Sequence, residues 1–182
     1  MTASLRILGV LACAHSITAC AAAPEDPARG SSSSSGGSSD GGSDDGVLDP
    51  APEVVPQGDT ALQQWLPRAL YRDWPAESAI HPSAGPHGGS VRTFVDPALF
   101  ESLQAGSAEH PVGASVVKEL YSGGAPVGWA VMVKIEPGAG GDAWYWYERS
   151  GSSVYADGPG EALCTGCHSA GVDFVRTPFP LQ

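Results

Sequence analysis

The fold is decided by the stretch ASVVKELYSGGAPVGWAVMVKIE, which runs from Ala114 to Glu136. Its two halves, residues 114–121 and 129–136, are rich in valine and aromatic residues, which favour β-strands. The Ser-Gly-Gly-Ala-Pro segment between them is typical of a hairpin connection. The stretch therefore predicts two antiparallel strands joined by a short turn.

Further strands and helices are expected on both sides of this hairpin. The segments predicted to be strands are residues 91–95, 143–149 and those near 152–156. Asp96 can cap a helix whose first turn accommodates Pro97. Residues 60–65 and 67–74 are expected to form a helix pair or one kinked helix. The predicted fold class is therefore α+β, mainly antiparallel β, with a single sheet-based domain and two or three helices.

Length and composition exclude several classes of protein. The 182 residues are enough for one domain with appendages, and a hydrophobic content of 42% is enough for a packed core. The formal net charge is −11, with only nine lysine and arginine residues. A nucleic-acid partner is therefore not expected, because phosphate binding needs clustered basic side chains.

Residues 1–20 have the pattern of an export signal. Arg6 precedes an apolar run that is too short to span a bilayer and that ends in small residues. The end of this segment, Ile17-Thr18-Ala19-Cys20, resembles the lipobox of bacterial lipoproteins, which implies that Cys20 is acylated. We expect an exported, lipid-anchored protein, at the outer membrane facing the periplasm or at the cell surface. An ordinary exported protein with an incidental cysteine is the alternative.

Residues 21–58 are predicted to form a disordered linker. Glycine, serine, aspartate and proline dominate this segment. Such a chain buries too little apolar surface to offset the entropy cost of ordering it. The folded domain is therefore expected over residues 59–182.

The strongest chemical signal is Cys164-Thr165-Gly166-Cys167-His168, the attachment sequence of c-type haem. Two thiols three positions apart can each bond one vinyl group, and the adjacent histidine then reaches the iron as proximal ligand. We expect one covalent haem c per chain, with His168 on the iron. The alternatives are a thioredoxin-like redox pair, which needs a βαβ context, and half of a zinc site, which needs a second ligand pair.

The ligand on the other side of the iron separates electron-transfer proteins from enzymes and gas binders. The strong ligands that remain in the domain are Met132, His81, His87 and His110. Met132 lies within a predicted strand, where a core role is the simpler explanation. The histidines lie in segments expected to be loops. The haem motif is also close to the C-terminus, with no methionine after Met132, unlike small class I electron-transfer cytochromes.

Lys118 is the second unusual residue. On a strand it shares one face with Val116 and Leu120, whereas Glu119 and Tyr121 share the other. Both faces carry apolar groups, so the ammonium group either points into a covered region or lies at the sheet edge beside an acid. A free buried lysine is costly unless it is paired, neutral or covalently used.

Several segments follow one another along the domain in a recognisable order: GPHG at residues 85–88, VRTFV at 91–95, GASVVKELY at 113–121, GWAVMVK at 128–134, WYWYE at 144–148 and the terminal C-x-x-C-H. From about Trp65 to Pro180, the chain thereby resembles the cytochrome P-460 family. The resemblance implies a mainly β fold, a homodimer in many members, and an open distal iron site. Founding members of that family oxidise hydroxylamine, and the related cytochromes c′-beta bind nitric oxide or other small ligands.

The resemblance also implies roles for particular residues. In the enzymatic members a lysine is covalently joined to the porphyrin edge; Lys118 is the best match by position, and Lys134 is the fallback. A distal carboxylate accepts protons, for which Glu119, Glu136 and Glu148 are the candidates. The expected function is haem-dependent oxidation of hydroxylamine or a related small nitrogen compound, with a periplasmic cytochrome as electron acceptor. A nitric-oxide-binding protein and an electron-transfer cytochrome are the alternatives.

Overall fold

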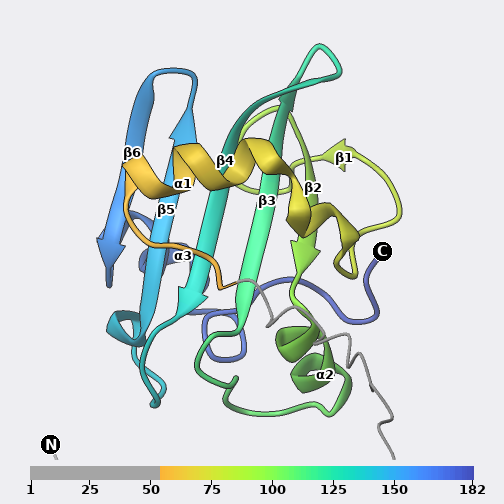
Figure 1. The fold of residues 1–182 in the computed structure, drawn as a ribbon. Coiled ribbons are helices and arrows are strands. Elements are labelled where there is room, and N and C mark those ends of the chain that lie inside the picture. Colours follow the sequence, from red (N-terminus) through yellow and green to blue (C-terminus); the bar gives the residue numbers. More distant parts are fainter. Residues whose placement is uncertain (1–53) are drawn as a thin grey trace, which may run out of the picture. The chain divides into compact units, whose positions relative to one another are not determined.

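Within residues 54–182, which the computed structural model describes, six antiparallel strands form one sheet (Figure 1). The strands are β1 (His81–Pro82), β2 (Ser90–Val95), β3 (Ser115–Ser122), β4 (Ala125–Lys134), β5 (Trp144–Ser150) and β6 (Ser153–Pro159). Each strand pairs with the next one along the chain. The predicted fold class, α+β with an antiparallel sheet and a few helices, is confirmed.

The central hairpin forms as predicted, but its turn is shorter than the predicted connection over residues 122–126, and β4 begins at Ala125 rather than at Trp129. Ser122 pairs with Ala125, so Gly123 and Gly124 alone make the turn between β3 and β4. Both glycines have positive φ angles, 60° and 85°, which glycine adopts without the penalty that a Cβ would bring. The turn therefore sets the pairing of Tyr121 with Pro126, and an irregularity between Leu120 and Tyr121 shifts the rest of the β3–β4 register by one residue.

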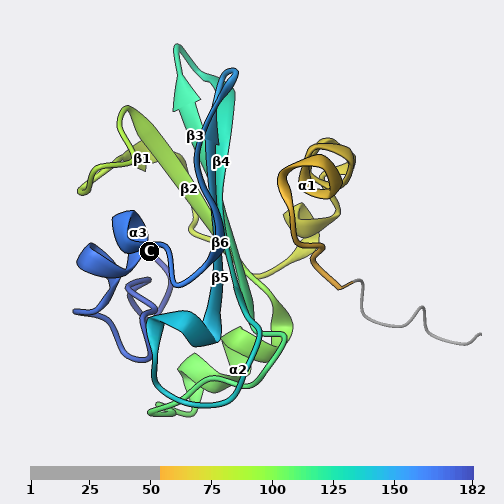
Figure 2. The same ribbon diagram turned by 90° about the vertical axis from the view of Figure 1, so that its left-hand side faces the viewer.

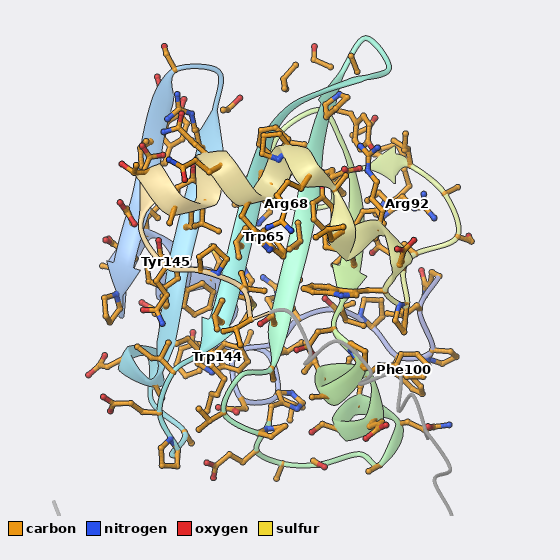
Figure 3. All side chains as sticks on the ribbon, viewed as in Figure 1. Trp65, Arg68, Arg92, Phe100, Trp144 and Tyr145 are labelled. Carbon is orange, nitrogen blue, oxygen red and sulfur yellow. The ribbon has the colours of Figure 1, made fainter. Side chains whose placement is uncertain are left out.

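One face of the sheet is covered by the first helical segment (Figure 2). This segment consists of α1 (Asp59–Trp65) and the 3-10 turns η1 (Leu66–Arg68) and η2 (Leu70–Asp73). Trp65 lies with an apolar cluster over the central strands (Figure 3). That cluster comprises Val55, Leu62, Trp65, Leu66, Tyr71, Phe94, Val117, Val131, Val133, Tyr145 and Tyr147. Since Val55 is buried, the packed part of the chain begins before α1.

The opposite face of the sheet carries α3 (Ala162–His168), and α2 (Pro97–Gln104) lies at the lower end of the sheet in Figure 2. Asp96 caps α2 as predicted: its Oδ1 accepts a hydrogen bond from the backbone N–H of Leu99 at 2.7 Å. A second apolar cluster lies on this face: Val95, Leu99, Ala114, Val116, Met132, Ala143, Trp144, Trp146 and Val175. The C-terminal motif is therefore carried on the side of the sheet away from α1.

Residues 1–53 lie outside the described part of the chain. The export signal, the acylation of Cys20 and most of the linker over residues 21–58 therefore stay predictions. Among the described residues, every helix is too short or too polar to cross a membrane.

Candidate functional site

A cavity of about 890 Å³ lies on the second face of the sheet. Its walls come from β3, β4 and β5, from α3, from the segment between β1 and β2, and from the C-terminal residues. Its volume is in the range of about 300–1,000 Å³ that is usual for cofactor and small-molecule sites. The walls bring together residues that are far apart in the sequence, so the cavity is the candidate functional site.

The helix α3 presents the two cysteines of the motif to this cavity. Cys164 is partly buried against the second apolar cluster. Burial raises the pKa of the Cys164 thiol to about 11, and the nearby carboxylates Glu148 and Glu161 add to the shift. Catalytic redox thiols have lowered pKa values instead. The environment of Cys164 thus disfavours the thioredoxin-like alternative.

His168 is oriented by a hydrogen bond on one side of its ring. Its Nδ1 lies 2.9 Å from the backbone carbonyl of Phe174, to which it donates, and its ring stands edge-on to Trp146 with centroids 4.8 Å apart. Burial lowers the pKa of His168, which favours the neutral ring. With Nδ1 engaged, Nε2 is the nitrogen available to a metal, as is usual for metal-bound histidine.

Lys118 lines the cavity, on the face that strand alternation predicts. Burial lowers the pKa of Lys118, and the carboxylates of Glu77 and Glu148 only partly oppose this effect. Among residues 54–182 its ammonium group has neither a hydrogen bond nor an ion pair. Lys118 is therefore a partly buried amine that faces a cavity without a partner.

The fallback Lys134 has a structural role. Its Nζ lies 2.8 Å from both carboxylate oxygens of Asp173, and both side chains are fully buried. A buried pair of this kind cannot lose one member without leaving the other charge uncompensated. Lys134 is also not among the cavity-lining residues. The geometry thus favours Lys118 over Lys134 as a functional lysine.

The three candidate carboxylates lie in three different places. Glu148 lines the cavity. Glu119 lies on the other face of the sheet, where it accepts hydrogen bonds from Tyr71 and Tyr121, and Glu136 is exposed beyond the end of β4. Only Glu148 of these three is therefore positioned to act in the cavity.

Glu77 also lines the cavity, although sequence reasoning missed it. Its Oε2 accepts a hydrogen bond from the backbone N–H of Thr93 at 2.6 Å and lies 3.0 Å from Nε2 of His81. The residues around Glu77 have no strand or helix periodicity, and Ala76 joins the sheet only through an isolated bridge. Nothing in the sequence could therefore have identified this carboxylate.

The remaining possible iron ligands differ in their surroundings. His110 is buried beside Ser102, with Nδ1 and Oγ 2.8 Å apart, and does not line the cavity. Met132 lines the cavity but is 95% buried within the second apolar cluster, as its predicted core role requires. His81 and His87 both line the cavity from the segment between α1 and β2.

The cavity residues fit a c-type haem. Cys164 and Cys167 lie on one helix beside the cavity, His168 offers Nε2, and Lys118 has no partner within the described chain. The buried Nδ1 of His87 likewise lacks a hydrogen bond among these residues. In residues 54–182, no group of three or more histidine, cysteine, aspartate or glutamate side chains could hold a metal ion alone. A zinc site built from the same motif therefore has no complete ligand set in this part of the chain.

In comparisons with known proteins, no family model and no curated protein matches the chain. Its function is therefore inferred from the cavity and from the residues that line it.

Proposed function

We propose that the chain is a mono-haem c-type protein of the cytochrome P-460 kind, which oxidises hydroxylamine or a related small nitrogen compound. One observation carries the proposal: the C-x-x-C-H helix and the unpaired Lys118 line the same cavity of about 890 Å³. The order of motifs that resembles the P-460 family supports the same conclusion.

The residues that would hold the haem are Cys164 and Cys167 through thioether bonds, His168 through Nε2, and Lys118 at the porphyrin edge. Bound there, a haem would supply a redox-active iron that can coordinate a small nitrogen compound and take up electrons from it. Part of the cavity wall is apolar and includes Val116 on β3.

Lys118 is suited to covalent attachment because a nucleophilic amine must be unprotonated. Burial lowers its pKa and thus raises the fraction of neutral amine. Joining Nζ to a ring carbon replaces one N–H and one C–H bond by a C–N bond. Two protons and two electrons are released, and dioxygen or a peroxide must accept the electrons. The resulting bond would alter the macrocycle, which is a recognised way for a protein to change haem reactivity.

Glu148 is the proposed proton acceptor. Oxidation of hydroxylamine releases protons, and a positioned carboxylate can take them up. Glu148 lies in the cavity wall and within 3.3 Å of Nδ1 of His87. The electrons would leave to a periplasmic acceptor cytochrome. Lipid anchoring through Cys20, the outer-membrane location and the homodimer belong to the same proposal.

The test uses the full chain, produced in a bacterial host that attaches c-type haem and assayed for hydroxylamine-dependent reduction of an artificial electron acceptor. Lys118→Met should retain haem but lose oxidation, and full turnover by this variant would contradict the role of Lys118. Glu148→Gln should slow oxidation, whereas Glu136→Gln, at an exposed carboxylate, should not. A wild-type protein that binds nitric oxide but never oxidises hydroxylamine would favour the ligand-binding alternative.

A further inference from the structure

His87 lies close to His168 across the cavity. Both residues line it, and their ring centroids are 6.3 Å apart with the ring planes inclined by 73°. A metal–imidazole bond is about 2 Å long and a ring nitrogen lies about 1 Å from its centroid, so two histidines on opposite sides of one metal have centroids about 6 Å apart. Two histidines on one metal can be rotated by any angle about the metal–nitrogen axis, so an inclination of 73° does not oppose such binding. The separation therefore matches that of two axial ligands on one iron.

In both rings Nδ1 faces an oxygen atom. Nδ1 of His168 faces the carbonyl of Phe174 at 2.9 Å, and Nδ1 of His87 faces Oε2 of Glu148 at 3.3 Å. The second contact is at ion-pair distance without the alignment of a hydrogen bond, so the buried Nδ1 of His87 is left unsatisfied among the described residues. Metal-bound histidines almost always present their second nitrogen to a carboxylate or a carbonyl. In both rings this arrangement leaves Nε2 for the metal.

No other candidate ligand on the cavity wall has a ring nitrogen available in this way. His81 has both nitrogens engaged, Nε2 with Glu77 at 3.0 Å and Nδ1 with the carbonyl of Pro82 at 2.9 Å. Met132 is packed within the second apolar cluster. His87 is therefore the residue best placed to face His168.

The backbone of the loop that carries His87 is anchored at both ends, and His87 itself lies outside the helices and strands. A Cβ on Gly89 would lie 2.4 Å from the carbonyl oxygen of Tyr121, so only glycine allows the loop to approach β3 this closely. The N–H of Ser83 donates to the carbonyl of Gly89 at 3.0 Å and closes the base of the loop. His87 lies between these two anchors. His168, by contrast, is the last residue of α3.

We propose that His87 is the second axial ligand of the haem iron in the resting protein, and that a small ligand or substrate binds by displacing it. This inference rests on the proposed function, because it requires the haem that Cys164, Cys167 and His168 would hold. It changes one expectation of that function: the sixth position is filled at rest and opens only when the loop at residues 83–89 releases His87. A small ligand then binds only the fraction of protein in which His87 is released. Its apparent affinity is the intrinsic affinity multiplied by that fraction.

The test compares haem-loaded wild-type protein with His87→Ala and His87→Gln, using the full chain. The ferric wild type should be low-spin by electron paramagnetic resonance and absorption spectroscopy. Both variants should be high-spin, and added imidazole should restore the low-spin state of His87→Ala. The ferrous His87→Ala protein should bind carbon monoxide at least about ten-fold faster than the wild type. His81→Ala is the matched control on the same segment and should behave as the wild type.

A high-spin ferric wild type would overturn the role of His87, as would a His87→Ala protein that stays low-spin. Haem staining after denaturation separates these failures from a failure of the proposed function. Covalent haem with a high-spin wild type contradicts only the inference about His87. Absence of covalent haem contradicts the proposed function and, with it, this inference.

Discussion

Two neighbouring residues of β3, Lys118 and Glu119, show how the two faces of the sheet differ. Glu119 is 1% exposed on the face covered by α1, and its carboxylate accepts hydrogen bonds from Tyr71, Arg72 and Tyr121. Lys118 faces the cavity and has no such partner among the described residues. Buried polar groups are normally satisfied. The satisfied face is therefore structural, and the unsatisfied face is where another group is expected to bind.

The largest effect that would test this difference is the loss of haem from the cavity face. Replacing Cys164 and Cys167 by serine, together with Lys118→Met, removes every proposed covalent bond to the haem. Haem staining on a denaturing gel should fall from one haem per chain to none. Haem that stays attached to this triple variant after denaturation would contradict the proposed attachment.

The next largest effect is a loss of stability, and we expect it from a substitution on the face covered by α1. Glu119→Leu leaves two tyrosine hydroxyls and Arg72 without their acceptor, which should lower the free energy of unfolding by about 3 kcal/mol. Lys118→Leu, one residue away, removes an unpaired amine and should change it by less than about 1 kcal/mol. Urea unfolding of haem-free protein measures both. Equal losses would contradict the assignment of a structural face and a binding face.

The pH dependence of stability sharpens the same contrast. Burial would raise the pKa of Glu119, but hydrogen bonds from Tyr121, Tyr71 and Arg72 outweigh it and hold the pKa below the ordinary value of 4.5. The unfolded chain therefore takes up the proton first as the pH falls. The stability that Glu119 contributes is fully present above the ordinary pKa of 4.5 and is lost as the pH falls through the lower pKa of the folded state.

Urea unfolding of the wild type and Glu119→Gln at several pH values measures this contribution. The wild type should be more stable at neutral pH by about 2 kcal/mol, and the difference should shrink as the pH falls below the ordinary pKa of 4.5. A difference that is constant over this range would show that the Glu119 charge does not stabilise the fold.

The smallest effect concerns the cap of α2. Asp96→Ala removes the cap of α2, and the loss should be about 1 kcal/mol in the free energy of unfolding. Asp96→Ser should recover most of it, because serine is also a good N-cap. Haem attachment should be unchanged in both variants. If serine gave no recovery, the loss could not be ascribed to capping.

The sequence predicts the parts of this architecture that depend on local patterns. Alternation along β3 places Lys118 and Glu119 on opposite faces, and Asp96 marks the start of α2. The segment over residues 122–126 predicts the central hairpin, although the turn itself is only Gly123-Gly124. The sequence pattern wrongly predicts that the second strand of this hairpin continues to Glu136, whereas β4 ends at Lys134. The residues that follow, Pro137 and Gly138, favour a turn rather than a strand.

The site itself could be predicted only in part. The C-x-x-C-H motif and Lys118 are visible in the sequence, but their shared cavity depends on how the C-terminal segment folds back onto the sheet. The choice of Glu148 over Glu119 follows from which face each side chain occupies. The position of Glu77 in the cavity wall and the short distance between His87 and His168 arise from contacts between distant segments. No local sequence pattern encodes such contacts.

Peptide mapping of the haem-loaded full chain by mass spectrometry shows whether Lys118 is bonded to the haem. The chain has only two lysines, Lys118 and Lys134, so each serves as the internal control for the other. We expect trypsin to cut after Lys134 but not after Lys118, and the Lys118 peptide to be joined through haem to the peptide with Cys164 and Cys167. A free Lys118 peptide beside a haem-bearing cysteine peptide would contradict the lysine bond and the oxidase proposal built on it.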